Sequence, residues 1–79
     1  MQLSKAKIEG IMAQQNVRAR EVCQRAGVSE PWFSDTVTRA NLGFDFTPKR
    51  ARTMADALQV EVGDILADVV ENAQAKQGG

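Results

Sequence analysis

Charged side chains supply most of the chemistry that this sequence can perform. The chain has ten Lys and Arg, ten Asp and Glu, a single cysteine, and neither histidine nor tyrosine. General acid–base catalysis would therefore depend on carboxylates alone, and these are scattered over the exteriors of the expected helices. No catalytic constellation is visible, and we expect that the protein is not an enzyme.

The cysteine count also limits metal and redox chemistry. A disulfide framework needs pairs of cysteines, and a zinc site needs several Cys or His ligands, so we expect neither a metal nor another cofactor. Cys23 occupies a position that we expect to be buried against the next helix, where a thiol packs as a small apolar group. A redox-sensing thiol is the alternative.

The basic residues are concentrated in the first part of the chain. Residues 1–52 contain nine Lys/Arg and five Asp/Glu, a net charge of +4, and residues 53–79 contain one Lys and five acids, a net charge of −4. Such asymmetry is typical of a protein that contacts a polyanion with one end. Chance clustering of charges on solvated helix faces is the alternative.

Five helical patterns separated by turn signals have to position these side chains. They cover roughly residues 4–15, 18–26, 29 or 30 to 38, 47–58 and 61–71, whereas the Arg39–Phe46 stretch reads as a loop and no stretch alternates like a strand. We expect one all-α domain over residues 1–71, followed by a flexible tail over residues 72–79. No apolar run is long enough for a membrane span and no signal-peptide pattern is present, so we expect a cytoplasmic protein without a membrane partner.

The stretch AGVSEPWFSDTV, residues 26–37, meets the requirements of a tight turn between two steeply crossing helices. Cys23 is small where the helices would meet, Gly27 tolerates a positive φ, and Val28 can plug the turn. Pro31 disfavours α conformation in the residue before it, so either Ser29 or its neighbour can cap the second of these helices.

With these residues the chain resembles the Cro/CI-like family of helix-turn-helix repressors. The similar stretches are REVCQRAGVS, a following helix with apolar Phe33, and TMADALQVEVGDIL at residues 53–66, and the resemblance spans about residues 8–70. It implies a five-helix, lambda-repressor-like bundle with a helix-turn-helix. Members of the family are mainly sequence-specific transcription regulators that bind operators as dimers, and many come from phages, plasmids and toxin–antitoxin loci. The Arg39–Phe46 loop is slightly longer than is usual in the family.

The resemblance implies that the third helix reads the major groove. With Phe33 buried, the neighbouring side chains turn outward, where acids can accept a hydrogen bond from cytosine and apolar groups can contact a thymine methyl. For Trp32 the alternative is the core, and for the acids it is a solvated place at a helix start, which the helix dipole favours. The residues expected to contact bases are Glu30, Pro31, Trp32, Ser34 and Asp35.

Affinity would then come from the flanks of that helix, through phosphate contacts. Lys49 and Arg50 stand at a helix start, where the dipole favours acids, and a nearby polyanion would explain them. Thr47 is expected to cap this helix, with Pro48 in its first position. The residues expected to contact phosphates are Arg18, Arg20, Ser29, Thr38, Arg39, Asn41, Lys49 and Arg50.

The last helical pattern has more apolar residues than inward packing requires. Val62, Ile65 and Leu66 are expected to face the core, which leaves Val69 and Val70 as the expected dimer interface. Completion of the monomer core by both valines is the alternative. The sequence thus predicts a homodimeric repressor that binds a pseudo-palindromic, double-stranded DNA operator through the helix beginning near Ser29.

The rival interpretation is a protein-interaction module, such as the DNA-binding half of an antitoxin, with an additional protein partner. Wrapping a toxin usually takes a long disordered segment, and residues 72–79 supply only a short one. The sequence therefore favours the transcription regulator.

Overall fold

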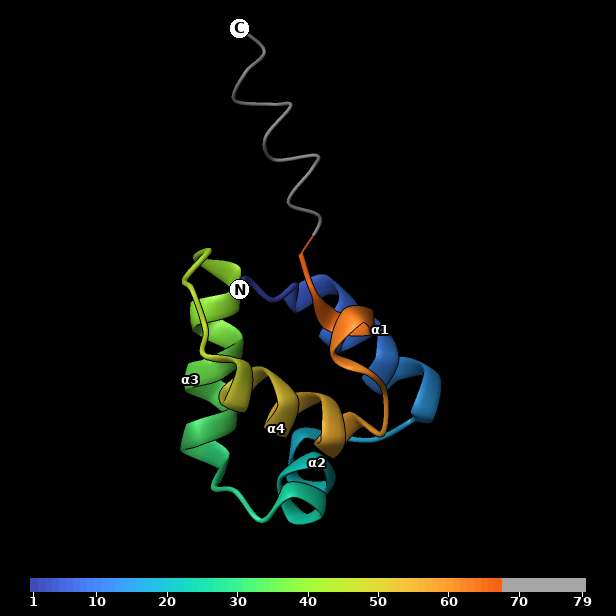
Figure 1. Cartoon of the computed structure of the whole chain (residues 1–79). Coiled ribbons are helices and arrows are strands. Elements are labelled where there is room, and N and C mark those ends of the chain that lie inside the picture. The colour runs from blue at the N-terminus through green and yellow to red at the C-terminus, as the bar shows by residue number, and fades with distance from the viewer. Residues whose placement is uncertain (68–79) are drawn as a thin grey trace, which may run out of the picture.

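The computed structural model describes residues 1–67, which form four α-helices and a short 3-10 helix (Figure 1). Within these residues no strand is present apart from one isolated antiparallel bridge between Leu3 and Leu66. The prediction of an all-α fold is confirmed for this part of the chain. In chain order the helices are α1 (Lys5–Gln15), α2 (Ala19–Ala26), α3 (Glu30–Asn41), α4 (Pro48–Leu58) and η1 (Val62–Ile65).

Local signals decide where most helices start and stop. The Ser4 hydroxyl accepts the Lys7 N–H at 3.1 Å, and the Thr47 hydroxyl accepts the Arg50 N–H at 3.2 Å. Gly27 ends α2 with a φ of 68°, a left-handed conformation that favours glycine. The starts and ends of α1, α2 and α4 therefore lie within one residue of the prediction.

Helix α3 is longer than predicted. It continues to Asn41 instead of ending near Thr38, so residues 39–41 are helical and not part of the predicted loop. The ion pair between Asp35 and Arg39, one turn apart, supports this part of the helix. The connection to α4 begins only at Leu42.

The prediction of an α-helix over residues 61–71 is wrong for the residues that the structure describes. Only Val62–Ile65 are helical, as a single 3-10 turn, and Leu66 is extended. The Ser4 N–H donates to the Ile65 carbonyl at 2.8 Å and the Ala67 N–H donates to the Gln2 carbonyl at 2.9 Å. This backbone segment pairs with the start of the chain instead of continuing a helix. Val69, Val70 and the tail predicted over residues 72–79 lie outside the described residues.

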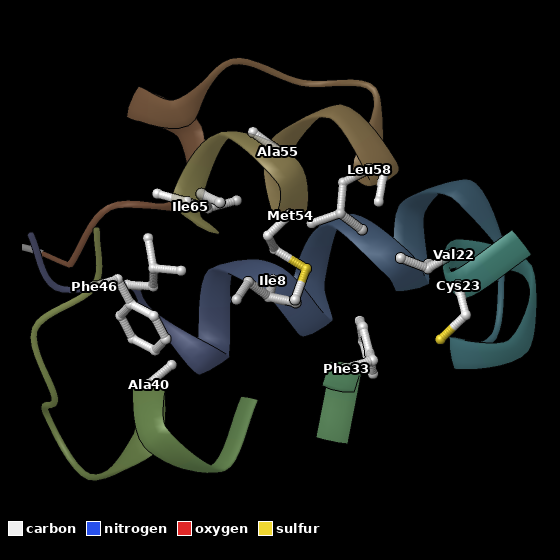
Figure 2. Close-up of a cluster of buried hydrophobic side chains, with 13 residues drawn as sticks. Ile8, Val22, Cys23, Phe33, Ala40, Phe46, Met54, Ala55, Leu58 and Ile65 are labelled. Carbon is white, nitrogen blue, oxygen red and sulfur yellow. The ribbon is translucent and has the colours of Figure 1, made fainter. Parts of the chain in front are cut away.

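The core lies between α4, which packs against α1, α2 and η1, and α3, which packs against α1 and α2 (Figure 2). Thr36 is the one buried polar residue among residues 1–67. Val62 and Leu66 are half-buried against the cluster and Ile65 is fully buried, as predicted for all three. The buried apolar residues are Leu3, Ile8, Val22, Cys23, Phe33, Ala40, Phe46, Ala51, Met54, Ala55, Ala57, Leu58 and Ile65.

Residues 1–4 connect two segments that are far apart in the sequence. Leu3 is 1% exposed and forms its bridge with Leu66 on one side. On the other side, Met1 and Phe46 exchange two backbone hydrogen bonds of 3.0 and 2.6 Å. The first four residues thus hold the connection between α3 and α4 against the end of η1.

Candidate nucleic-acid interface

The connection between α2 and α3 consists of Gly27, Val28 and Ser29. The Val28 N–H donates to the Cys23 carbonyl at 3.1 Å, and the Val28 side chain is half-buried against the core. The Ser29 hydroxyl accepts the Trp32 N–H at 3.2 Å, so Ser29 is the N-cap of α3. Pro31 therefore lies in the first turn, where a missing N–H costs no hydrogen bond.

Cys23 is a core residue of α2 beside this connection. The residue is 4% exposed, and its thiol donates to the Ser29 carbonyl over 3.6 Å. Burial raises the pKa of the thiol, and the nearby Glu30 carboxylate raises it further. The thiol is therefore protonated at neutral pH, as expected for a packing role and unlike a reactive thiolate.

The exposed face of α3 consists of two adjacent rows of side chains, each with a spacing of four residues. Phe33, Thr36 and Ala40 point to the core, and Val37 is half-buried. The resulting face contains four of the five residues predicted to contact bases, and all four are exposed. One row consists of Glu30, Ser34 and Thr38, and the other consists of Pro31, Asp35 and Arg39.

Trp32 lies at the edge of this face and not at its centre. Its side chain is half-buried and packs against the core, and its ring centroid lies 5.1 Å from the Arg50 guanidinium carbon. It also lines an open hollow of about 280 Å³ between α3, the start of α4 and Val28. Trp32 thus belongs partly to the core and partly to the surface, which leaves both sequence interpretations open.

Arg50 bridges α4 and α3. Its Nε donates to the buried Thr36 hydroxyl at 3.0 Å, and a terminal nitrogen donates to the Asp35 carboxylate at 3.0 Å. The guanidinium carbon also lies 5.9 Å from the ring centroid of Phe46, and the side chain is only 28% exposed. These contacts hold the guanidinium against α3, so Arg50 is less available to a phosphate than the other residues predicted for that role.

The negative charge of Asp35 is compensated by two arginines. One carboxylate oxygen accepts from Arg39 Nε at 2.9 Å and from Arg50 at 3.0 Å. The hydrogen bond from Arg39 is the main cause that lowers the pKa of Asp35, and Arg50 adds to it. The carboxylate therefore stays ionised at neutral pH, but its charge is compensated on the face of α3.

Basic side chains border the α3 face on two sides. Arg20, at the start of α2, is exposed, and its Nε lies 4.0 Å from the Glu30 carboxylate. Lys49, at the start of α4, is exposed beside the hollow that Trp32 lines. Arg18 is the exposed N-cap of α2. The face thus lies between two helix starts that both carry positive charge.

The other residues predicted to contact phosphates lie along α3. Ser29 is exposed at its start, and Thr38 lines a hollow of about 400 Å³ between α1, the start of α2 and α3. Asn41 is exposed at the end of the helix. Arg39 lies near it, with its guanidinium carbon 5.3 Å from the Phe44 ring centroid. Seven of the eight predicted residues are therefore exposed, and Arg50 is the exception.

The sequence interpretation missed Thr36 as a hydrogen-bond partner and Phe44 as a ring beside a cation. The pairing of Asp35 with Arg39 has a local signal, because the two are four residues apart on a helix. The contact between Thr36 and Arg50 has no local signal, because the two residues are fourteen positions apart and lie on different helices.

Comparison with protein families, with curated proteins and with solved structures finds no match to this chain. None of the helices within residues 1–67 has the length and apolar composition that crossing a bilayer requires. The same residues contain no group of three or more His, Cys, Asp or Glu placed to hold a metal ion.

Proposed function

We propose that the chain is a sequence-specific, double-stranded-DNA-binding transcription regulator, which acts in the cytoplasm as a dimeric repressor on a pseudo-palindromic operator. The observation that carries the proposal is the exposed face of α3 between the basic starts of α2 and α4. In this proposal α2 and α3 form the helix-turn-helix of a lambda-repressor-like bundle, as the resemblance to Cro/CI-like repressors implies. The recognition helix of that motif enters the major groove.

The first half of α3 supplies the groups that read bases. Ser34 offers a hydroxyl that both donates and accepts, and Glu30 offers an acceptor for the amino group of cytosine. Pro31 offers an apolar contact for a thymine methyl. Asp35 and Trp32 are held by Arg50, which gives them a fixed orientation at the side of α4. A surface of this kind favours selectivity over affinity, since it carries little net positive charge.

Affinity comes from the flanks of the helix. Arg18 and Arg20 at the start of α2 and Lys49 at the start of α4 would contact phosphates on either side of the groove that α3 enters. The start of α2 adds to this attraction, because the first N–H groups of a helix carry a partial positive charge. These contacts carry no sequence information, so they position α3 and leave the reading to its exposed face.

Selection from a pool of random duplexes at low salt tests the proposal. We expect an enriched pair of half-sites about one helical turn apart, and a binding constant that falls with salt by a log–log slope of about 0.9 for each neutralised phosphate. A selection that enriches no duplex at low salt would overturn the proposal.

Substitutions then separate the two kinds of contact on the selected duplex. Lys49→Ala should weaken binding to all duplexes alike and reduce the salt slope by about one, whereas Ser34→Ala should relax the preference at one position. Arg52→Ala is the matched control, because Arg52 lies on the same helix but lines a different hollow, with Asp56 and Glu61. It should change neither quantity.

A protein-interaction module remains the second candidate, and one observation favours it. Met1, Leu42 and Phe44 are large apolar residues that are exposed, and the last two directly follow α3. A chain that binds another protein through them and selects no duplex would support this candidate instead.

A further inference from the structure

Arg39 is the one basic residue of α3. Its side chain is 46% exposed and lies in the same row of the helix face as Pro31 and Asp35. The basic residues that border this face come from the starts of α2 and α4 instead. Arg39 thus lies with the residues proposed to read bases, and not with those proposed to contact phosphates.

Two contacts hold the guanidinium of Arg39. Its Nε donates to Asp35 Oδ2 at 2.9 Å, and its central carbon lies 5.3 Å from the centroid of the Phe44 ring. The Phe44 N–H donates to the Arg39 carbonyl at 3.0 Å, which keeps the two residues side by side. An unrestrained arginine loses conformational entropy when it binds, and these contacts remove part of that cost before DNA arrives.

Asp35 is held in its turn from α4. The oxygen that accepts from Arg39 also accepts from a terminal nitrogen of Arg50 at 3.0 Å. Arg50 is anchored because its Nε donates to the buried Thr36 hydroxyl at 3.0 Å. Helix α3 packs against α1 and α2 but not directly against α4, so Arg50 spans the space between the two helices. One guanidinium therefore fixes the carboxylate that holds the other.

The terminal nitrogens of Arg39 remain available to a ligand. Arginine has five N–H groups in a planar fork, and within residues 1–67 only the Nε of this side chain donates a hydrogen bond. The two terminal nitrogens form the end of the fork. Such an end matches two acceptors that lie side by side, and guanine presents O6 and N7 in this way in the major groove.

We infer that Arg39 reads a guanine through its two terminal nitrogens, and that Asp35 is the residue that positions it. The inference rests on the proposed function and deepens it, because it names one base of the operator half-site. The second oxygen of Asp35 accepts no hydrogen bond within the described residues. It can therefore still accept from the amino group of a cytosine.

The Asp35 carboxylate favours a base over a phosphate beside Arg39. A phosphate carries a full negative charge, which the carboxylate repels at short range, whereas the edge of guanine is uncharged. Adenine and thymine each present a single acceptor in the major groove, and cytosine presents a donor. Guanine is therefore the base that satisfies both terminal nitrogens at once.

Duplexes that contain 7-deazaguanine test the inference. In this base a C–H group replaces N7, so one major-groove acceptor is lost while the phosphates and the base pairing stay the same. In the duplex enriched by selection, this substitution at one guanine of each half-site should weaken wild-type binding by about fivefold or more. It should leave the affinity of Arg39→Ala unchanged, because that variant has no guanidinium to lose the bond.

Lys49→Ala provides the contrast, because Lys49 is proposed to contact a phosphate. This variant should bind both duplexes more weakly than wild type does, but it should keep the full difference between them. Because each variant is compared on two duplexes, a change in the stability of the folded protein affects both affinities alike and cancels.

Substitution of Asp35 tests its positioning role. Asp35→Ala should lose most of the difference at the same guanine as Arg39→Ala does. Asp35→Glu keeps a carboxylate one helical turn from Arg39 and should retain part of the difference. A purely structural role would weaken binding to both duplexes equally. Retention of the full difference in Asp35→Ala would therefore remove Asp35 from the inference.

Other results would overturn the reading of guanine by Arg39. One is a selected half-site that contains no guanine. Another is a wild-type chain that binds the standard and the 7-deazaguanine duplexes equally at every position while Arg39→Ala binds both more weakly, which is the behaviour of a phosphate contact. The proposed function would stand in both cases, because a duplex has been selected. Failure to select any duplex would overturn the proposed function, and this inference with it.

Discussion

Two neighbouring aromatic residues of α3 have different surroundings, and their substitution should separate stability from binding. Phe33 is 8% exposed in the core, so Phe33→Ala should lower the free energy of unfolding by about 3–5 kcal/mol. Trp32 is half-buried at the edge of the helix, so Trp32→Ala should cost clearly less. Thermal denaturation of both variants measures the difference. Equal losses would mean that Trp32 belongs to the core and contributes no surface for reading DNA.

The pKa of Asp35 makes the link between α3 and α4 sensitive to acid. Because Arg39 and Arg50 lower this pKa, the carboxylate stabilises the fold at neutral pH, and that contribution is lost as the pH falls through the lowered value. Titration followed by NMR should give a pKa below the ordinary range of aspartate. The stability of wild type should fall more on acidification than that of Asp35→Asn. An ordinary pKa would show that the two ion pairs do not persist in solution.

At the scale of the elements, the turn between α2 and α3 depends on the backbone of Gly27. A Cβ there would meet no atom within 4 Å, but the φ of 68° disfavours any residue with a side chain. Gly27→Ala should therefore lower stability by about 1–2 kcal/mol through backbone strain alone. Denaturant unfolding measures this loss.

Gly10 provides the matched control for Gly27. It lies inside α1, and its Cβ position is equally open. Gly10→Ala should raise stability by about 0.5–1 kcal/mol, because alanine loses less entropy in a helix than glycine does. The same substitution should thus change the free energy of unfolding in opposite directions at the two positions. A change in the same direction at both would contradict the assigned conformations.

The sequence predicts elements well where the signal is local. Ser4, Gly27, Thr47 and Pro48 act within one turn of their own helix, and α1, α2 and α4 begin and end close to the predicted residues. The prediction of a fifth helix is wrong because apolar spacing does not indicate whether the backbone of this segment forms hydrogen bonds with a distant segment. Leu66 pairs with Leu3, more than sixty residues away, and this pairing replaces helical hydrogen bonds.

For the candidate site too, the sequence predicts what depends on local spacing and does not predict contacts between helices. Burial of Phe33 and helical spacing correctly place Glu30, Pro31, Ser34 and Asp35 on an exposed face. The position of a long side chain such as that of Arg50 depends instead on how two helices cross, which the spacing along one helix does not contain. Arg50, which is predicted to contact phosphate, also bridges Thr36 and Asp35 in the structure, and its spacing in the sequence does not indicate this.

For the whole molecule, Leu3 is the residue on which the first segment depends. It is 1% exposed and belongs to the core cluster, so Leu3→Ala should cost about 2–5 kcal/mol. Gln2→Ala removes only an exposed hydrogen bond to Gly43 and should cost well under 1 kcal/mol. Chemical denaturation of both variants measures these losses. Similar small losses would show that residues 1–4 contribute little to the fold.

The bridge between Leu3 and Leu66 has a consequence for the order in which the protein folds. Helices form from contacts within a few residues and fold fast, whereas this bridge must close a loop of about sixty residues, which costs loop entropy that no local contact repays. We expect the two joined segments to open together as one cooperative unit. In native-state hydrogen exchange, the amides of Ser4 and Ala67, which donate across this junction, should then share a single opening free energy well above that of fraying backbone.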